Sequence, residues 1–268
     1  MLALILSLGL IAITGYALRG GFAGAGWNRA GFDVNALGLS AVAIAAAIWF
    51  FGWQYGLAFI IAIMVHEIGH VAAFRVCGHK DAQFQLIPLF GGVTVSRSLP
   101  ASHDRDLFIS LMGPAICLGP MALCFATANL IFLQAPEIAS FLYIQGLVLG
   151  GLNLFNLLPF WPLDGGKIVR LLTYTFFPKA TRAVSILMSA AAAALCVATH
   201  SYILLFFVLM GWQGLIQSEQ LIEIQRPMRK STAWIALAAY LCTAGALYLG
   251  EAIRAKPVLK RLCDRRLT

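Results

Sequence analysis

A 32-residue stretch of this sequence, Val34–Val65, contains no Asp, Glu, Lys or Arg. The whole chain is similar: 60% of its 268 residues are hydrophobic and 11% are charged, whereas a soluble globular domain carries about 25% charged residues. A hydrocarbon core about 30 Å thick needs roughly 20 apolar residues to cross it as a helix. The composition therefore predicts an all-α polytopic membrane protein.

The apolar runs predict about eight transmembrane segments. The first run could instead be a signal peptide, although no basic region precedes it and no clear cleavage site follows it. The stretch 183–217 could be one long helix or two short ones, since His200 and Ser201 interrupt it. The expected spans are 2–18, 35–53, 55–77, 106–133, 141–161, 183–198, 201–217 and 232–250.

The net charge of +8 follows the membrane topology. Lys and Arg gather in alternate loops, whereas the loops near 54, 134–140 and 199–201 contain neither. This is the positive-inside pattern, and it explains the charge without a nucleic-acid partner. It places the C-terminal end of the 55–77 helix on the cytoplasmic side. The tail 251–268 carries further basic residues where eight spans would place it outside, so the side of the tail stays open.

Three ionisable residues, His66, Glu67 and His70, stand together inside one of the apolar runs. Residues four apart share one face of a helix, so both imidazoles can bind one Zn²⁺. Glu67 lies beside them, placed to act on a water that the metal activates. The alternative is that the three only pack helices together. That role would be an expensive one, because each ionisable group costs a few kcal/mol to insert.

A catalytic zinc site usually has a third protein ligand and one open position. Asp164 is the candidate, in "NLFNLLPFWPLDGG" (153–166) at the cytoplasmic end of an apolar run. Pro159 and Pro162 break the helix there, as happens where membrane proteins expose a site within the bilayer. Without the two histidines, the same residues would be read as a simple helix-ending turn.

The segment 84–96, "FQLIPLFGGVTVS", predicts a short hairpin or bent strand, because β-branched and aromatic residues flank a Gly-Gly pair. It is too short to span a membrane, and a re-entrant element near the cytoplasmic face fits it. We expect its strand edge to hold an unwound substrate by main-chain hydrogen bonds. The residues expected to bind substrate are Gly91, Gly92, Val93, Thr94 and Val95.

"HEIGH" at 66–70 followed by "NLLPFWPLDGG" at 156–166 resembles the site-2 protease family of intramembrane zinc metalloproteases. The resemblance covers roughly residues 55–217. It implies one Zn²⁺ per chain, bound by His66, His70 and Asp164. It further implies that Glu67 is the general base and that Asn156 helps stabilise the oxyanion.

We therefore expect an intramembrane zinc metalloprotease that cuts in or near the transmembrane segment of a single-span membrane protein, in regulated intramembrane proteolysis. The alternatives are a catalytically silent binder of membrane peptides and a metal or proton transporter. The expected location is a bacterial plasma membrane, with the active site toward the cytoplasm. The expected partners are this substrate and the lipid bilayer, with no nucleic acid; the oligomeric state is left open. We expect three parts: two N-terminal transmembrane helices (1–54), a catalytic membrane core (55–182), and C-terminal transmembrane helices with a basic tail (183–268).

Overall fold

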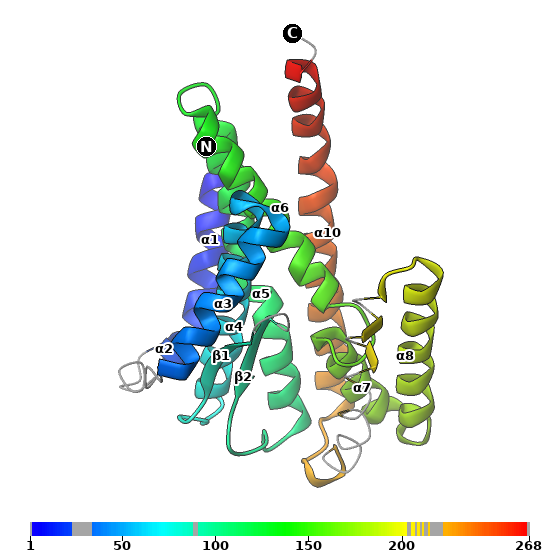
Figure 1. The fold of residues 1–268 in the computed structure, drawn as a ribbon. Coiled ribbons are helices and arrows are strands. Elements are labelled where there is room, and N and C mark those ends of the chain that lie inside the picture. Colours follow the sequence, from blue (N-terminus) through cyan, green and yellow to red (C-terminus); the bar gives the residue numbers. More distant parts are fainter. Residues whose placement is uncertain are drawn as a thin grey trace. The chain divides into compact units, whose positions relative to one another are not determined.

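The computed structural model describes residues 2–22, 34–87, 91–202, 205–206, 208–209, 211, 214 and 222–266, and it is mainly helical (Figure 1). The elements are α1 (Leu2–Ala17), α2 (Arg19–Phe22), α3 (Val34–Phe51), α4 (Trp53–Val76), β1 (Gln83–Ile87), β2 (Gly91–Val95), α5 (His103–Ile131), α6 (Pro136–Asn156), α7 (Asp164–Phe176), η2 (Pro178–Ala180), α8 (Thr181–Ala198) and α10 (Lys230–Arg266).

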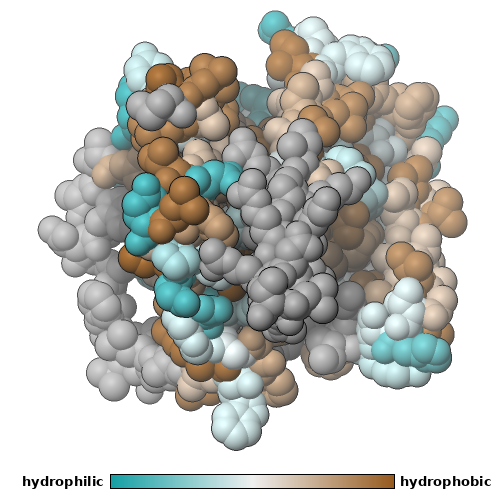
Figure 2. Space-filling view, turned by 90° about the horizontal axis from the view of Figure 1, so that it is seen from above, coloured by the Kyte–Doolittle hydropathy of each residue, from teal (hydrophilic) through white to brown (hydrophobic). Residues whose placement is uncertain are grey.

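Within the described residues, five helical segments are long and apolar enough to cross a membrane. They are Trp53–Val76, His103–Ile131, Pro136–Asn156, Pro178–Ala198 and Lys230–Ala252, while Leu2–Ala17 is a shorter apolar helix. On the face drawn in Figure 2, brown hydrophobic side chains cover much of the described surface, and teal hydrophilic residues form small groups. A polytopic helical membrane protein is thereby confirmed, and the total of eight spans stays a prediction.

The chain divides into two compact units. The first contains residues 1–98, 112–154 and 243–268, and the second contains residues 99–111 and 155–242. Each unit draws on distant parts of the sequence because long helices such as α5 and α10 begin in one unit and continue in the other. The three-part division by residue range (1–54, 55–182 and 183–268) stays a prediction.

In the first unit, α4 is packed closely against its neighbours. Gly52 alone separates α3 from α4, and its φ of 78° is a left-handed conformation that favours glycine. A Cβ at Gly56 would meet the backbone of Ala47 and Ile48 on α3 at 2.7 Å. A Cβ at Gly69 would collide with the carbonyl oxygen of Met112 on α5. These glycines allow the neighbouring backbones to lie against the helix that carries the histidines.

The hairpin expected in 84–96 is present as two antiparallel strands, with Gln83 opposite Val95 and Ile87 opposite Gly91. The tip between them, 88–90, lies outside the described residues. Both strands contact α4 in the first unit (Figure 1). The hairpin is confirmed, whereas its re-entrant position in a membrane stays a prediction.

Polar side chains tie the open end of the hairpin to the end of α4. The Arg97 backbone N–H donates to Asp81 at 2.6 Å, and this bond lowers the pKa of the Asp81 carboxyl. Ser96 Oγ donates to the same carboxylate at 3.2 Å and lies 3.1 Å from His79 Nδ1. These bonds hold the C-terminal end of β2 beside the last turn of the zinc-motif helix.

The second unit contains a turn that the sequence only partly predicts. The expected span 141–161 ends early, because α6 stops at Asn156 and Leu157–Leu163 forms turns around the two prolines. A short amphipathic helix that the sequence did not predict, α7, follows at Asp164–Phe176 and buries Ile168, Leu171 and Leu172. Thirteen residues are too few to span a bilayer.

The stretch 183–217 is not one continuous helix. α8 ends at Ala198, and His200 has a φ of 54°, which breaks the helical path. Much of the expected span 201–217 lies outside the described residues. Val208 packs with Ala192 and Cys196 of α8, and Phe160 from the proline turn lies against this cluster.

Candidate functional site

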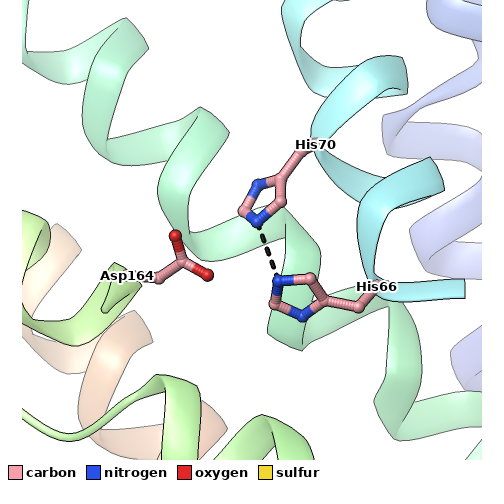
Figure 3. A group of neighbouring side chains, drawn as sticks. All are labelled: His66, His70 and Asp164. Carbon is pink, nitrogen blue, oxygen red and sulfur yellow. Dashed lines mark hydrogen bonds between the residues drawn. The ribbon is translucent and has the colours of Figure 1, made fainter. Parts of the chain in front are cut away.

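The two motif histidines lie on one face of α4, as the i, i+4 spacing predicts. Their Nε2 atoms face each other at 3.0 Å, and their rings are nearly perpendicular (Figure 3). Both side chains are buried, with 4% of His66 and 8% of His70 exposed. Two imidazole lone pairs at this distance repel each other unless a proton or a cation lies between them. The two nitrogens can therefore share a proton or bind one metal ion.

A residue that the sequence reasoning did not select, Asn153, fixes the tautomer of His66. This asparagine lies on α6 and is fully buried. Its Nδ2 donates to the Leu149 carbonyl at 2.7 Å, so its Oδ1 is the atom that faces His66 Nδ1, also at 2.7 Å. An amide oxygen only accepts, so His66 carries its proton on Nδ1. Its Nε2 lone pair is then available to a metal, as in metal sites where a neighbour orients the histidine.

Glu67 is buried, and its carboxylate is held by the hairpin. Thr94 Oγ1 on β2 donates to Glu67 Oε2 at 2.6 Å. This contact orients the carboxylate and leaves its second oxygen for other partners. Of the five residues expected to bind substrate, Thr94 therefore also contacts the expected base. Gly91, Gly92, Val93 and Val95 lie on the same strand.

Gly113 of α5 lies directly against the histidine pair. A Cβ placed there would collide with the His70 ring and would lie 2.9 Å from His66 Cε1. The motifs in the sequence do not mark this glycine as a site residue. In the structure its lack of a side chain leaves room for both imidazoles.

Asp164 is described within the second unit, where it is the first residue of α7. A carboxylate in the first turn of a helix is favoured by the helix dipole, and Lys167 Nζ lies 3.3 Å from Asp164 Oδ1. The side chain is 5% exposed and is drawn with the two histidines in Figure 3.

The turn before Asp164 explains the two glycines after it. A Cβ at Gly165 would collide with the Leu157 carbonyl, and one at Gly166 would collide with the Phe160 backbone. The hydroxyl of Tyr240 on α10 donates to the Leu157 carbonyl at 2.6 Å and fixes the turn. Asn156, the expected oxyanion residue, is the half-buried last residue of α6 at the start of this turn. The "LDGG" sequence thus lets the turn fold tightly onto α7.

These features define a class of protein: a multi-pass helical membrane protein that carries candidate zinc ligands on a buried helix. Residues 119–199 match a sequence model described as peptidase family M50. This match contains Asp164 and Asn156 and lies after the His66–His70 motif.

Named relatives agree with this match. Zinc metalloprotease MJ0392 of Methanocaldococcus jannaschii is 30% identical over 41% of this chain and 31% of its own length. Putative zinc metalloprotease Rip3 of Mycobacterium tuberculosis is 33% identical over 47% of this chain and 32% of its own length. Stage IV sporulation protein FB of Bacillus subtilis is 29% identical over 43% of this chain and 39% of its own length. The matches span about a third of the length of these relatives.

A solved structure of a site-2 protease from Methanocaldococcus jannaschii is 19% identical, covering 69% of this chain and 87% of that one, with a TM-score of 0.44. The family match and the named zinc metalloproteases confirm the resemblance recognised from "HEIGH" and "NLLPFWPLDGG": this chain is similar to the zinc metalloproteases of peptidase family M50.

Proposed function

We propose that this protein is a zinc metalloendopeptidase that hydrolyses a peptide bond in or near the transmembrane segment of a membrane protein. The observation that carries the proposal is the His66–His70 pair, with Nε2 atoms 3.0 Å apart and Glu67 beside it on a buried helix. That helix is of membrane-spanning length and composition. The names of the relatives, which include two zinc metalloproteases, support the same activity.

The residues fit a zinc ion. His66, His70 and Asp164 are buried and each offers one ligand atom, either an imidazole nitrogen or a carboxylate oxygen. Two nitrogens and one oxygen form a donor set that zinc takes in catalytic sites, where a fourth position stays open. The Nδ1 proton that Asn153 fixes on His66 supports this assignment, because Nε2 is then the ring nitrogen that offers a lone pair. We propose one ion per chain.

Zinc, when bound, supplies Lewis acidity that makes a water reactive near neutral pH and polarises the scissile carbonyl. Glu67 accepts the proton of the attacking water and then delivers it to the leaving amine. The Thr94 hydroxyl holds this carboxylate in one orientation through both transfers. The side-chain amide of Asn156 donates a hydrogen bond to the substrate oxygen as negative charge develops there.

We propose that β2 presents a backbone edge to the substrate. A transmembrane helix uses its own carbonyls and N–H groups, so it must unwind before hydrolysis, and unpaired groups cost several kcal/mol each in a bilayer. Among the described residues the sheet has only two strands, so β1 occupies one edge of β2. An extended peptide can add to the other edge by β-augmentation. The Thr94 contact to Glu67 puts that strand beside the expected base.

The basic loops support a cytoplasmic orientation for the C-terminal end of α4, where the hairpin follows. The proposal accordingly includes eight spans, a re-entrant hairpin, a bacterial plasma membrane and regulated proteolysis of a single-span substrate. It includes no nucleic-acid partner.

The test uses the full chain purified in detergent and reconstituted in liposomes with a single-span test substrate. One zinc per chain and cleavage by the wild type, with cleavage lost in Glu67→Gln, would support the protease. Bound zinc without cleavage of any single-span substrate would favour a silent peptide binder. Zinc or proton flux across the vesicle membrane would favour a transporter.

A further inference from the structure

A cavity of about 710 Å³ lies in the second unit, where two long helices begin. Its lining includes Ser102, Asp104 and Arg105 at the start of α5, and Arg229 and Thr232 at the start of α10. Arg226, from the segment before α10, also lines it. None of these residues belongs to the proposed zinc site.

The walls of this cavity are held in place by backbone hydrogen bonds. The His103 N–H donates to the Arg226 carbonyl at 3.0 Å, and the Arg226 N–H donates to the Ala101 carbonyl at 3.3 Å. Gln225 adds two side-chain bonds, to the Pro100 carbonyl at 3.0 Å and to Asp106 at 3.1 Å. The backbone that carries Arg226 is therefore fixed against the start of α5.

The lining of this cavity attracts anions. The lining contains three arginines and one carboxylate, that of Asp104, so it carries net positive charge. The first turns of α5 and α10 add backbone N–H groups that have no acceptor within their own helices. Arginine guanidinium groups bind phosphate oxygens in a bidentate manner. This chemistry suits a phosphate group.

The position of the cavity distinguishes a lipid phosphate from a free one. Both helices that begin here are candidate membrane spans, and a helix that crosses a bilayer has its first turn near the boundary between water and hydrocarbon. On α10, Trp234 and Ile235 follow the cavity residue Thr232, and their side chains are 62% and 71% exposed. Exposed apolar side chains directly after a basic cavity provide contacts for acyl chains, and Trp is enriched at membrane interfaces.

We propose that this cavity binds the headgroup phosphate of an anionic phospholipid. Arg226 and Arg229 contact the phosphate, and the exposed side chains of Trp234 and Ile235 contact the acyl chains. Basic pockets beside transmembrane helices on the cytoplasmic side bind anionic headgroups in this manner. The inference does not depend on the proposed proteolysis, because it uses none of the zinc-site residues.

The test measures binding of short-chain phosphatidylglycerol to the full chain in detergent by native mass spectrometry. A basic residue at a membrane surface contributes about 1 kcal/mol, or roughly fivefold in affinity. The double variant Arg226→Gln/Arg229→Gln should therefore bind the lipid about 25-fold more weakly than the wild type. The matched control is Lys179→Gln/Arg182→Gln, which also removes two positive charges from exposed positions of the second unit, and it should bind like the wild type.

Two competitors identify the source of the phosphate. Phosphatidylcholine of the same chain length should bind weakly, and inorganic phosphate should displace phosphatidylglycerol only at far higher concentration. Equal binding of phosphatidylcholine, or displacement by equimolar inorganic phosphate, would overturn the proposal. Unchanged lipid affinity in the double variant, with helical content like that of the wild type, would also overturn it.

Discussion

Asn153 offers a sharp test of the zinc site, because its single contact to His66 fixes a tautomer. Replacing Asn153 with Ala removes Oδ1, the buried acceptor that lies 2.7 Å from His66 Nδ1. An unsatisfied buried donor costs about 1–3 kcal/mol. Loss of an orienting partner of a metal ligand typically costs about 10–100-fold in metal affinity. A tenfold change in affinity corresponds to about 1.4 kcal/mol, so the cost of the unsatisfied donor and the loss of metal affinity agree in size.

The assay is zinc affinity, measured by competition with a chelator on the purified full chain. Asn153→Ala should bind zinc about 10–100-fold more weakly than the wild type. Asn129→Ala is the matched control, because Asn129 makes the same bond to the carbonyl four residues earlier on α5. Equal zinc affinity in Asn153→Ala and the wild type would refute the tautomer argument.

The other predictions concern the catalytic groups and the substrate strand. Glu67→Gln should keep zinc and lose about 10²–10⁴-fold in cleavage rate, measured on the single-span substrate; cleavage at the wild-type rate would remove Glu67 as the base. Asp164→Ala should lower zinc content in elemental analysis, and unchanged zinc would place the third ligand elsewhere. Thr94→Val should lower the turnover number with zinc retained, while Thr94→Ser, which keeps the hydroxyl, should restore it; equal turnover in both variants would refute the orienting role. Val93→Pro removes a strand N–H and should abolish cleavage with zinc retained, whereas Val93→Thr keeps that N–H and should cleave. Normal cleavage by the proline variant would place substrate capture outside β2.

The apolar runs predict most helices to within a few residues, because charged residues are costly to bury in a bilayer and are therefore rare in segments that cross it. The end of α6 was less predictable. Hydropathy continues through Leu157 and Leu158, but Pro159 and Pro162 stop the helix at Asn156. The amphipathic α7 was missed because it is short and follows a run of loop-forming residues.

The partners of the motif residues could not be read from the motifs. The sequence does mark Asn153 as unusual, because it is a polar residue in an apolar helix one turn before Asn156. Its contact with His66 could not be predicted, because the two residues are 87 positions apart in the sequence. Glu251 is similar: the sequence assigns it to the basic tail, whereas a Cβ on Gly150 of α6 would collide with its carboxylate in the first unit. Contacts of this kind depend on which helix faces pack together.

The sequence by itself determined the membrane class, the order of most helices and the chemistry of "HEIGH", because these depend on composition and on local i, i+4 geometry. Only the tertiary structure decided which proton His66 carries, that Thr94 holds Glu67, and that Gly113 leaves space for the imidazoles. It also placed Arg226 against the start of α5 to form the basic cavity. These features join residues that are far apart in the chain, and such contacts depend on how helices pack, which neither periodicity nor motif spacing specifies.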